Sequence, residues 1–211
     1  MKIYKKLVIQ RNIIPKDEVE LAMRYKDDEK KEKITKAAIR LINEVGLAEI
    51  SISKIAKEAG IAPGTVYTYF DNKDDMLRKL FLEAKKDMQQ KISNGVNISE
   101  PTEAEFKKIL NNYITFFINN KDNFLFIEQF MNSPFVLKIY EEVEMIGRPL
   151  VEFLENGKKS GVFKEVDIEL LFIYSFSPLM QIAKKYFNGE FEFTEQNIKK
   201  IIELSCTSIK K

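Results

Sequence analysis

Apolar residues recur along most of this chain at the three- and four-residue spacing of an α-helix. The first clear stripe begins at Ile34 and continues to Val45, directly before Gly46. Later stripes of the same period predict helices over residues 73–92, 102–119, 122–131, 135–159, 167–187 and 194–209. No segment predicts a strand. The pattern therefore indicates an all-α fold.

Glycine and proline divide these predicted helices. Residues 93–101, SNGVNISEP, combine one glycine, two asparagines and two serines with a closing proline, which predicts the clearest boundary in the chain. Pro149 lies inside the helix predicted over 135–159 and should kink it or divide it near Gly147, because proline has no amide hydrogen. We therefore expect an N-terminal extension over 1–28, a first domain over 29–92 and a second over 101–211.

The most informative stretch is residues 51–70, SISKIAKEAGIAPGTVYTYF. Ser51 is the expected N-cap of a short helix whose apolar residues follow at helical spacing. Gly60 suits the left-handed position that ends a helix, and Pro63 suits the first turn of the next one, over 63–69. Two short helices joined by such a turn form a helix-turn-helix, whose second helix typically lies in the major groove of DNA.

Composition narrows the possible functions. The chain has no histidine and one cysteine, Cys206, so it lacks the commonest general base and cannot form an intrachain disulfide or a zinc site. We expect no enzyme activity, no metal and no cofactor. No apolar run approaches the roughly 18 residues of a membrane span, so we expect a cytoplasmic protein with no membrane partner.

Charge is distributed unevenly. The net charge of the chain is +2. Residues 1–91 contain 20 basic and 15 acidic side chains, whereas residues 92–211 contain 14 basic and 17 acidic side chains. The front part therefore carries +5 and the back part −3. This asymmetry favours a polyanionic partner for the front part.

Residues 34–77 resemble the DNA-binding domain of the TetR family (TetR/AcrR type) of bacterial regulators. The shared features are a glycine that ends the first helix, a serine that opens the second, the pattern Ile-Ala-x-x-Ala-Gly-Ile, the pattern Gly-Thr-x-Tyr-x-Tyr-Phe and a lysine that opens the next helix. In this sequence they are Gly46, Ser51, Ile55, Ala56, Ala59, Gly60, Ile61, Gly64, Thr65, Tyr67, Tyr69, Phe70 and Lys73. Ala62 departs from the pattern, since serine is common there, and Lys54 stands where an acid would complete a capping box.

The resemblance implies an N-terminal three-helix helix-turn-helix domain, a linker helix and a C-terminal helical domain for ligand binding and dimerisation. Its partners would be double-stranded DNA with a palindromic operator and a second copy of the chain, bound through the last two helices, about 167–187 and 194–209. Expected DNA contacts are Ser51, Pro63, Gly64, Thr65, Tyr67, Thr68, Tyr69 and Lys73. Of these, Tyr69 and Lys73 would hold phosphates.

Residues 1–33 mix basic and apolar residues up to Pro15 and are largely charged after it. They either extend the next helix backwards from Pro15 or form a loosely held tail, and Met23 is a plausible alternative start. A sharper interpretation is a basic arm that touches DNA phosphate beside the main site.

Aromatic and methionine residues are frequent in the second domain, where the resemblance implies a pocket for an unknown small hydrophobic ligand. The candidate pocket residues are Phe106, Tyr113, Phe117, Phe126, Phe130, Tyr140, Phe176 and Met180. The expected function is a repressor that such a ligand releases from its operator. The alternative is a DNA-binding dimer with no small-molecule effector, controlled by a protein partner or acting constitutively; a sealed aromatic core would favour it.

Overall fold

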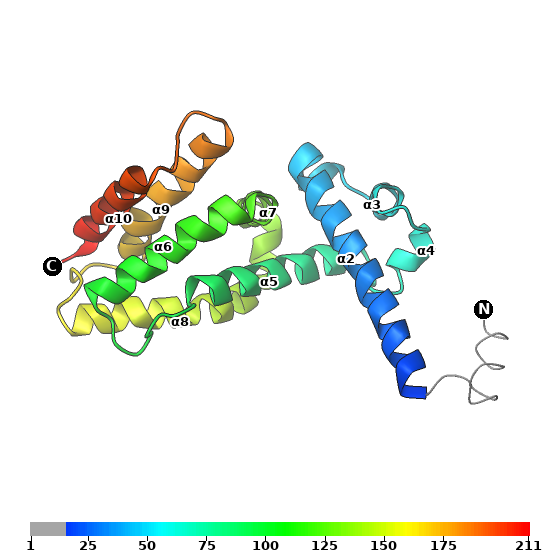
Figure 1. The fold of residues 1–211 in the computed structure, drawn as a ribbon, viewed down its shortest axis with the longest axis horizontal. Coiled ribbons are helices and arrows are strands. Elements are labelled where there is room, and N and C mark those ends of the chain that lie inside the picture. The colour runs from blue at the N-terminus through cyan, green and yellow to red at the C-terminus, as the bar shows by residue number, and fades with distance from the viewer. Residues whose placement is uncertain (1–15) are drawn as a thin grey trace. The chain divides into compact units, whose positions relative to one another are not determined.

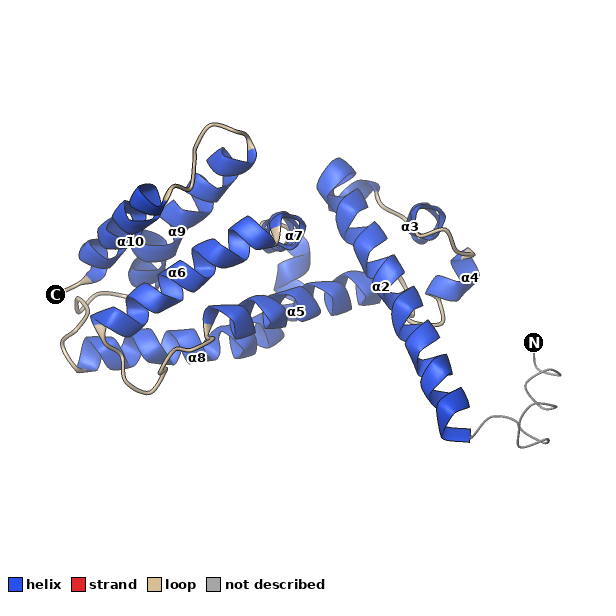
Figure 2. Cartoon of the chain, viewed as in Figure 1, coloured by secondary structure: helices blue, strands red, loops and turns tan. Residues whose placement is uncertain are grey.

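The computed structural model describes residues 16–211, and this part of the chain consists of helices and connecting loops without a strand (Figures 1 and 2). The elements are α2 (Lys16–Glu49), α3 (Ile52–Glu58), α4 (Pro63–Val66), α5 (Lys73–Ile92), α6 (Glu103–Asn119), α7 (Lys121–Met131), the 3-10 helix η1 (Pro134–Ile139), α8 (Tyr140–Lys159), α9 (Ile168–Phe187) and α10 (Glu195–Ile209). None of these helices is long and apolar enough to cross a membrane. The predicted all-α fold is confirmed.

Contacts group the residues into two compact units, one up to Met76 and one from Leu77 onward, so that the division falls within α5. This division reflects contacts between residues and does not test where the functional domains begin and end. The predicted end of the first domain at residue 92 and the predicted start of the second at residue 101 therefore stay predictions.

In the first unit, α2 begins at Lys16. Of the two alternatives for this segment, a backward extension of the next helix or a loosely held tail, the structure has the helical extension. Gly46 breaks it with φ of 82°, as its position in the sequence predicts. The apolar stripe of α2 is buried from Ile34 to Ile42 against the rest of the unit. The mixed basic and apolar segment before Lys16, which a basic arm would need, lies outside the described residues.

The second unit differs from prediction at η1 and α8. The helix expected from Phe135 begins as the 3-10 helix η1 and continues as α8 from Tyr140 to Lys159, because tight 3-10 turns are common at helix starts. Of the two outcomes expected at Pro149, a kink or a division near Gly147, the division is wrong, since α8 runs through Pro149. Pro149 removes the helical donor for the Met145 carbonyl, and Met145 lies on the exposed side of α8, where water can replace that donor.

The core of the second unit is rich in phenylalanine. Helices α6, α9 and α10 pack against one another, and α8 packs against α9 (Figure 1). Phe106 of α6 meets Phe153 of α8 and Phe176 of α9, with ring centroids 6.3 and 5.9 Å apart. Aromatic rings therefore join three helices at the centre of this unit.

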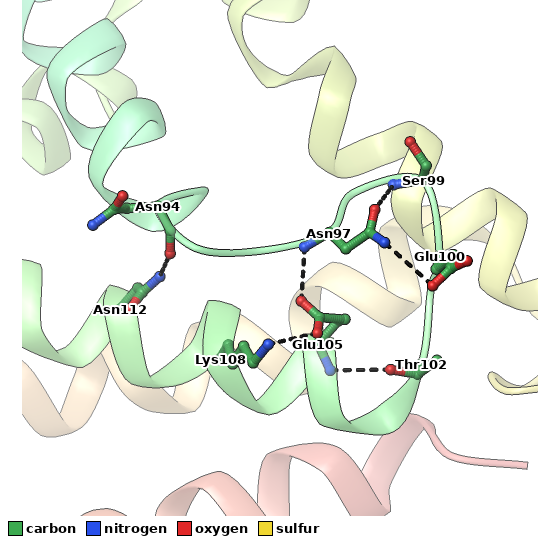
Figure 3. A network of polar contacts seen from close by, with 8 residues as sticks. All are labelled: Asn94, Asn97, Ser99, Glu100, Thr102, Glu105, Lys108 and Asn112. Carbon is green, nitrogen blue, oxygen red and sulfur yellow. Dashed lines mark hydrogen bonds and ion pairs between the residues drawn. The ribbon is translucent and has the colours of Figure 1, made fainter.

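The loop between α5 and α6 is held by polar contacts to the start of α6 (Figure 3). The Asn97 amide donates to the Glu105 carboxylate at 2.7 Å, and Lys108 donates to the same carboxylate at 2.6 Å. Further along α6, the Asn112 side chain donates to the Asn94 carbonyl at 2.9 Å. The segment predicted as the clearest boundary is thus held to α6 near its start, at Asn94, and at its middle, at Asn97.

Candidate nucleic-acid interface

The first helix of the helix-turn-helix begins as predicted. Ser51 is the N-cap of α3, and its Oγ accepts a hydrogen bond from the Lys54 amide at 3.2 Å. Lys54, which departs from the family pattern, donates its Nζ to the Glu49 carbonyl at 2.7 Å. Its side chain therefore ties α3 to the preceding turn in place of a capping-box contact.

Gly60 ends α3 in the left-handed conformation, with φ of 66°. The Ile61 amide donates to the Ala56 carbonyl at 2.9 Å, and the Gly60 amide donates to the Lys57 carbonyl at 3.1 Å. This pair of bonds is a Schellman motif, which satisfies carbonyls that a helix end would leave free. The predicted helix-turn-helix is confirmed.

The second helix of the motif, α4, covers only Pro63–Val66 and is shorter than the predicted 63–69. After Val66 the chain continues in tighter i to i+3 turns, since the Thr68 amide donates to the Thr65 carbonyl at 3.2 Å. Ala62 gives no side-chain cap, and Pro63 occupies the first turn, as the sequence indicates.

Two buried side chains fix the outward face of α4. Val66 is 0% exposed and Phe70 is 1% exposed, so both point into the core of the first unit. This orientation leaves the residues between and before them on the surface. The exposed residues are Pro63, Gly64, Tyr67 and Thr68, whereas Thr65 and Tyr69 are half-buried.

Besides Ser51, three of the predicted DNA contacts already have partners within the protein. Lys73 Nζ donates to the Ala48 carbonyl at 3.3 Å, and Thr68 Oγ1 donates to the Gly64 carbonyl at 3.4 Å. The Tyr69 hydroxyl lies 3.4 Å from the main-chain oxygen of Asp27, in α2. An ammonium group has three hydrogens, so Lys73 can keep its internal partner and still donate to a phosphate.

The face formed by α4 and the turn after it suits a nucleic-acid backbone. Hydroxyl groups donate to phosphate oxygens, and a lysine supplies charge-assisted hydrogen bonds to them. Exposed aromatic and threonine side chains can reach base edges and the thymine methyl. The structure brings the predicted residues 63–73 together on the first unit, with Ser51 at the start of α3.

The residues predicted to line a ligand pocket differ in their ring contacts and in their burial. Tyr113 contacts Phe117 and Phe176, with centroids 4.4 and 5.2 Å apart, and burial raises the pKa of its hydroxyl well above the ordinary value. Phe126 and Phe130 instead meet Phe81 of α5. The set divides into buried Phe106, Phe117, Phe126, Phe130 and Phe176, half-buried Tyr113 and Met180, and Tyr140, which is 61% exposed at the start of α8.

A separate groove of about 430 Å³ lies between α5 and α8. The Arg78 guanidinium forms an ion pair with the Glu142 carboxylate, and both side chains line this groove. The other lining residues are Lys79, Leu82, Glu83, Lys86, Met145 and Ile146, none of which belongs to the predicted pocket. The sequence offers no local signal for this groove, because its two sides are some sixty residues apart.

Two family models match the chain. "Bacterial regulatory proteins, tetR family" matches residues 34–80, and "Tetracyclin repressor-like, C-terminal domain" matches residues 101–210. An uncharacterized HTH-type transcriptional regulator of Haemophilus influenzae is 25% identical over 189 residues, covering 90% of this chain and 100% of that protein.

Solved structures share the fold over most of the chain. A TetR family transcription regulator from Marinobacter aquaeolei superposes with a TM-score of 0.82 at 23% identity, covering 89% of this chain and 99% of that one. The transcriptional regulator FadR from Bacillus subtilis, in complex with stearoyl-CoA, gives a TM-score of 0.66 at 22% identity and covers 85% and 99%. With both family models matched, this chain belongs to the TetR family of DNA-binding transcriptional regulators.

Proposed function

We propose that the protein is a dimeric repressor that binds a palindromic operator through α4 and is released from it by a small hydrophobic ligand. The observation that carries the proposal is the orientation of α4, in which buried Val66 and Phe70 turn the polar side of the recognition segment outward. Its relatives are regulators rather than enzymes. A regulator of this kind acts on chromosomal DNA, so we place it in the cytoplasm.

For the DNA contacts, we assign base reading to Thr65, Tyr67 and Thr68 and phosphate binding to Tyr69 and Lys73. Pro63 and Gly64 let the backbone approach the duplex, because glycine has no side chain and proline has only a compact ring at the start of α4. Ser51 holds the start of α3, which in turn positions α4. Each base contact of this kind contributes about 1–3 kcal/mol to discrimination between sequences.

For the dimer, we assign the interface to α9 and α10. Both helices carry large apolar side chains on the surface: Tyr174 is 60% exposed and Leu204 is 73% exposed, and Leu170 and Ile173 are also exposed. Leu170, Ile173 and Tyr174 follow the i, i+3, i+4 spacing, so they share one face of α9. A contiguous apolar face of this kind is typical of an interface between proteins.

For the ligand, we assign the site to the aromatic residues around Tyr113. An acyl chain is the ligand class that these residues suit best, because their side chains are almost entirely apolar. The fold is shared with Bacillus subtilis FadR, which binds stearoyl-CoA. Effector binding would favour a spacing of the two recognition segments that no longer fits the operator.

The second candidate is a dimer that binds DNA without a small-molecule effector. Direct ring contacts support it, since Tyr113, Phe117 and Phe176 already pack against one another. A core closed by such contacts has no room for an acyl chain unless the rings move.

The two candidates are separated by titrating stearoyl-CoA into the protein bound to a fluorescent operator duplex, with acetyl-CoA as the control. The repressor proposal expects release by stearoyl-CoA alone, together with a higher melting temperature. Replacing Phe176 by tryptophan should fill the site and abolish release while DNA binding persists. If no acyl-CoA of any chain length releases the protein from the operator duplex, whether or not it raises the melting temperature, the result supports the effector-free dimer instead.

A further inference from the structure

The N-terminal part of α2 reaches the recognition segment. Figure 1 shows that α2 continues well past α4 toward its N-terminus. In this N-terminal part of α2, the main-chain oxygen of Asp27 lies 3.4 Å from the Tyr69 hydroxyl, and the carboxylate Oδ1 of Asp27 lies 3.5 Å from it. Two residues that are 42 positions apart in the sequence are thereby joined beside α4.

The contact occupies the group that would bind phosphate. A phenol has one hydrogen, so a Tyr69 hydroxyl that donates to Asp27 cannot donate to a DNA phosphate at the same time. Desolvation, and then the charges of Asp27 and Asp28, raise the pKa of Tyr69 and keep its hydrogen in place. Tyr69 therefore remains a donor for which an aspartate and a phosphate compete.

The charge at this place also opposes DNA. Residues 16–33 contain seven acidic and six basic side chains, so the described extension is not a basic arm. Glu29 and Glu32 are paired with Lys33 and Lys36 one turn away, at 2.9 and 2.6 Å. The Asp27 carboxylate instead faces Tyr69, where an approaching phosphate would meet a like charge.

We propose that Asp27 is an affinity-determining residue that weakens DNA binding, because it holds the Tyr69 hydroxyl in the free protein and repels the phosphate that would replace it. The inference rests on the proposed function, which assigns Tyr69 to phosphate binding. The extension of α2 thus keeps the recognition segment from binding DNA of any sequence too tightly. A repressor gains from this, since weak non-specific binding favours its operator over the rest of the chromosome.

The test compares Asp27→Asn with Glu18→Gln in the full chain. Both remove one negative charge from the exposed part of α2, but residue 18 lies nine positions, or about 13 Å, before Asp27 along the helix. Affinity is measured by fluorescence anisotropy with a labelled 30-base-pair duplex of random sequence, over a series of KCl concentrations. Tyr69→Phe and Lys73→Ala are measured alongside, and circular dichroism melting checks that each variant is folded.

We expect Asp27→Asn to bind about two- to fivefold more tightly at low salt, the range of an exposed charge pair, and Glu18→Gln to change affinity by less than half as much. In the Tyr69→Phe background the gain from Asp27→Asn should shrink, because the shared hydrogen is gone. The inference is overturned if Asp27→Asn leaves the affinity unchanged or lowers it, or if Glu18→Gln raises the affinity equally. The proposed function still stands in that case, provided that Tyr69→Phe and Lys73→Ala weaken binding. If those two variants bind as the wild type does, the phosphate assignment itself fails.

Discussion

Ser208 of α10 lies with its Oγ 3.2 Å from the main-chain oxygen of Tyr174 in α9. Pro178 stands four residues after Tyr174 and has no amide hydrogen to give to that oxygen. The same hydroxyl also donates to the Ser205 carbonyl of its own helix at 2.7 Å, so its one hydrogen is shared between that carbonyl and the Tyr174 oxygen, which lacks its helical donor. The contact thus gives the Tyr174 oxygen a partner in α10 at the point where α9, Ile168 to Phe187, contains a proline.

Ser208→Ala should lower the free energy of unfolding by about 0.5–1.5 kcal/mol, the usual contribution of one hydrogen bond, whereas Ser208→Thr keeps the hydroxyl and should cost less. The effect is measured by urea denaturation. In a Pro178→Ala background the loss on Ser208→Ala should shrink, because the new amide hydrogen at position 178 takes over. Equal losses in both backgrounds would show that Ser208 acts through Ser205, its other acceptor, rather than through Tyr174.

Gly157 and Gly147 of α8 offer a matched pair. A Cβ at Gly157 would overlap the ring of Phe163, which is buried against Phe106 at 5.2 Å, whereas a Cβ at Gly147 meets nothing within 4 Å. Gly157→Ala should therefore cost about 1–3 kcal/mol of unfolding free energy through overpacking. Gly147→Ala should gain about 1 kcal/mol from helix propensity. Thermal melting of both variants decides it, and equal stabilities would contradict the close contact at Phe163.

Several parts of this structure follow from local chemistry and were predictable. Gly46 and Gly60 end helices at positive φ, Ser51 caps α3, and Pro63 opens α4 in the places that the sequence indicates. Each depends on residues within one or two turns of itself. The helix-turn-helix was therefore identifiable without the structure.

The missed features depend on residues that are distant in sequence. The contacts of Tyr69 with Asp27 and of Arg78 with Glu142 join positions 42 and 64 residues apart, and periodicity carries no information about such pairs. Periodicity also did not reveal that Tyr140 stands at the exposed start of α8. A stripe of apolar residues predicts a buried face but not where that face stops.

Gly60 and Gly64 should separate folding from DNA binding. Gly60→Ala forces a Cβ into the left-handed conformation, at a cost of about 1–2 kcal/mol in stability. Gly64 lies in the first turn of α4 with nothing within 4 Å of an added Cβ, so Gly64→Ala should not destabilise the protein. If the backbone at Gly64 approaches DNA, Gly64→Ala should still weaken binding in an anisotropy titration. Wild-type affinity for Gly64→Ala would remove this residue from the interface.

Lys85 should make stability depend on pH above neutrality. Burial lowers its pKa from the ordinary value of 10.5 to about 8, so between these values the unfolded chain holds a proton that the folded protein has released. The penalty for the buried charge is complete below pH 8 and is relieved as the pH rises toward 10.5.

Lys85→Met should therefore raise the unfolding free energy at pH 7 by about 1–3 kcal/mol and flatten its rise between pH 8 and 10.5. The measurement is urea denaturation at a series of pH values, with exposed Lys86→Met as the control. If the two variants have the same pH profile, the Lys85 ammonium is better hydrated than its place in the fold indicates.

We propose above all that a symmetric dimer reads DNA through Thr65 on α4 and through Tyr67 and Thr68 in the turn after it. Selection of bound sequences from a pool of random duplexes by the wild-type protein, repeated with Thr68→Ala, tests it most directly. We predict an enriched inverted repeat of two half-sites, with preference relaxed at one symmetry-related base pair in each half-site for the variant. Enrichment of no sequence, or of an asymmetric one that Thr68→Ala leaves unchanged, would contradict the claim.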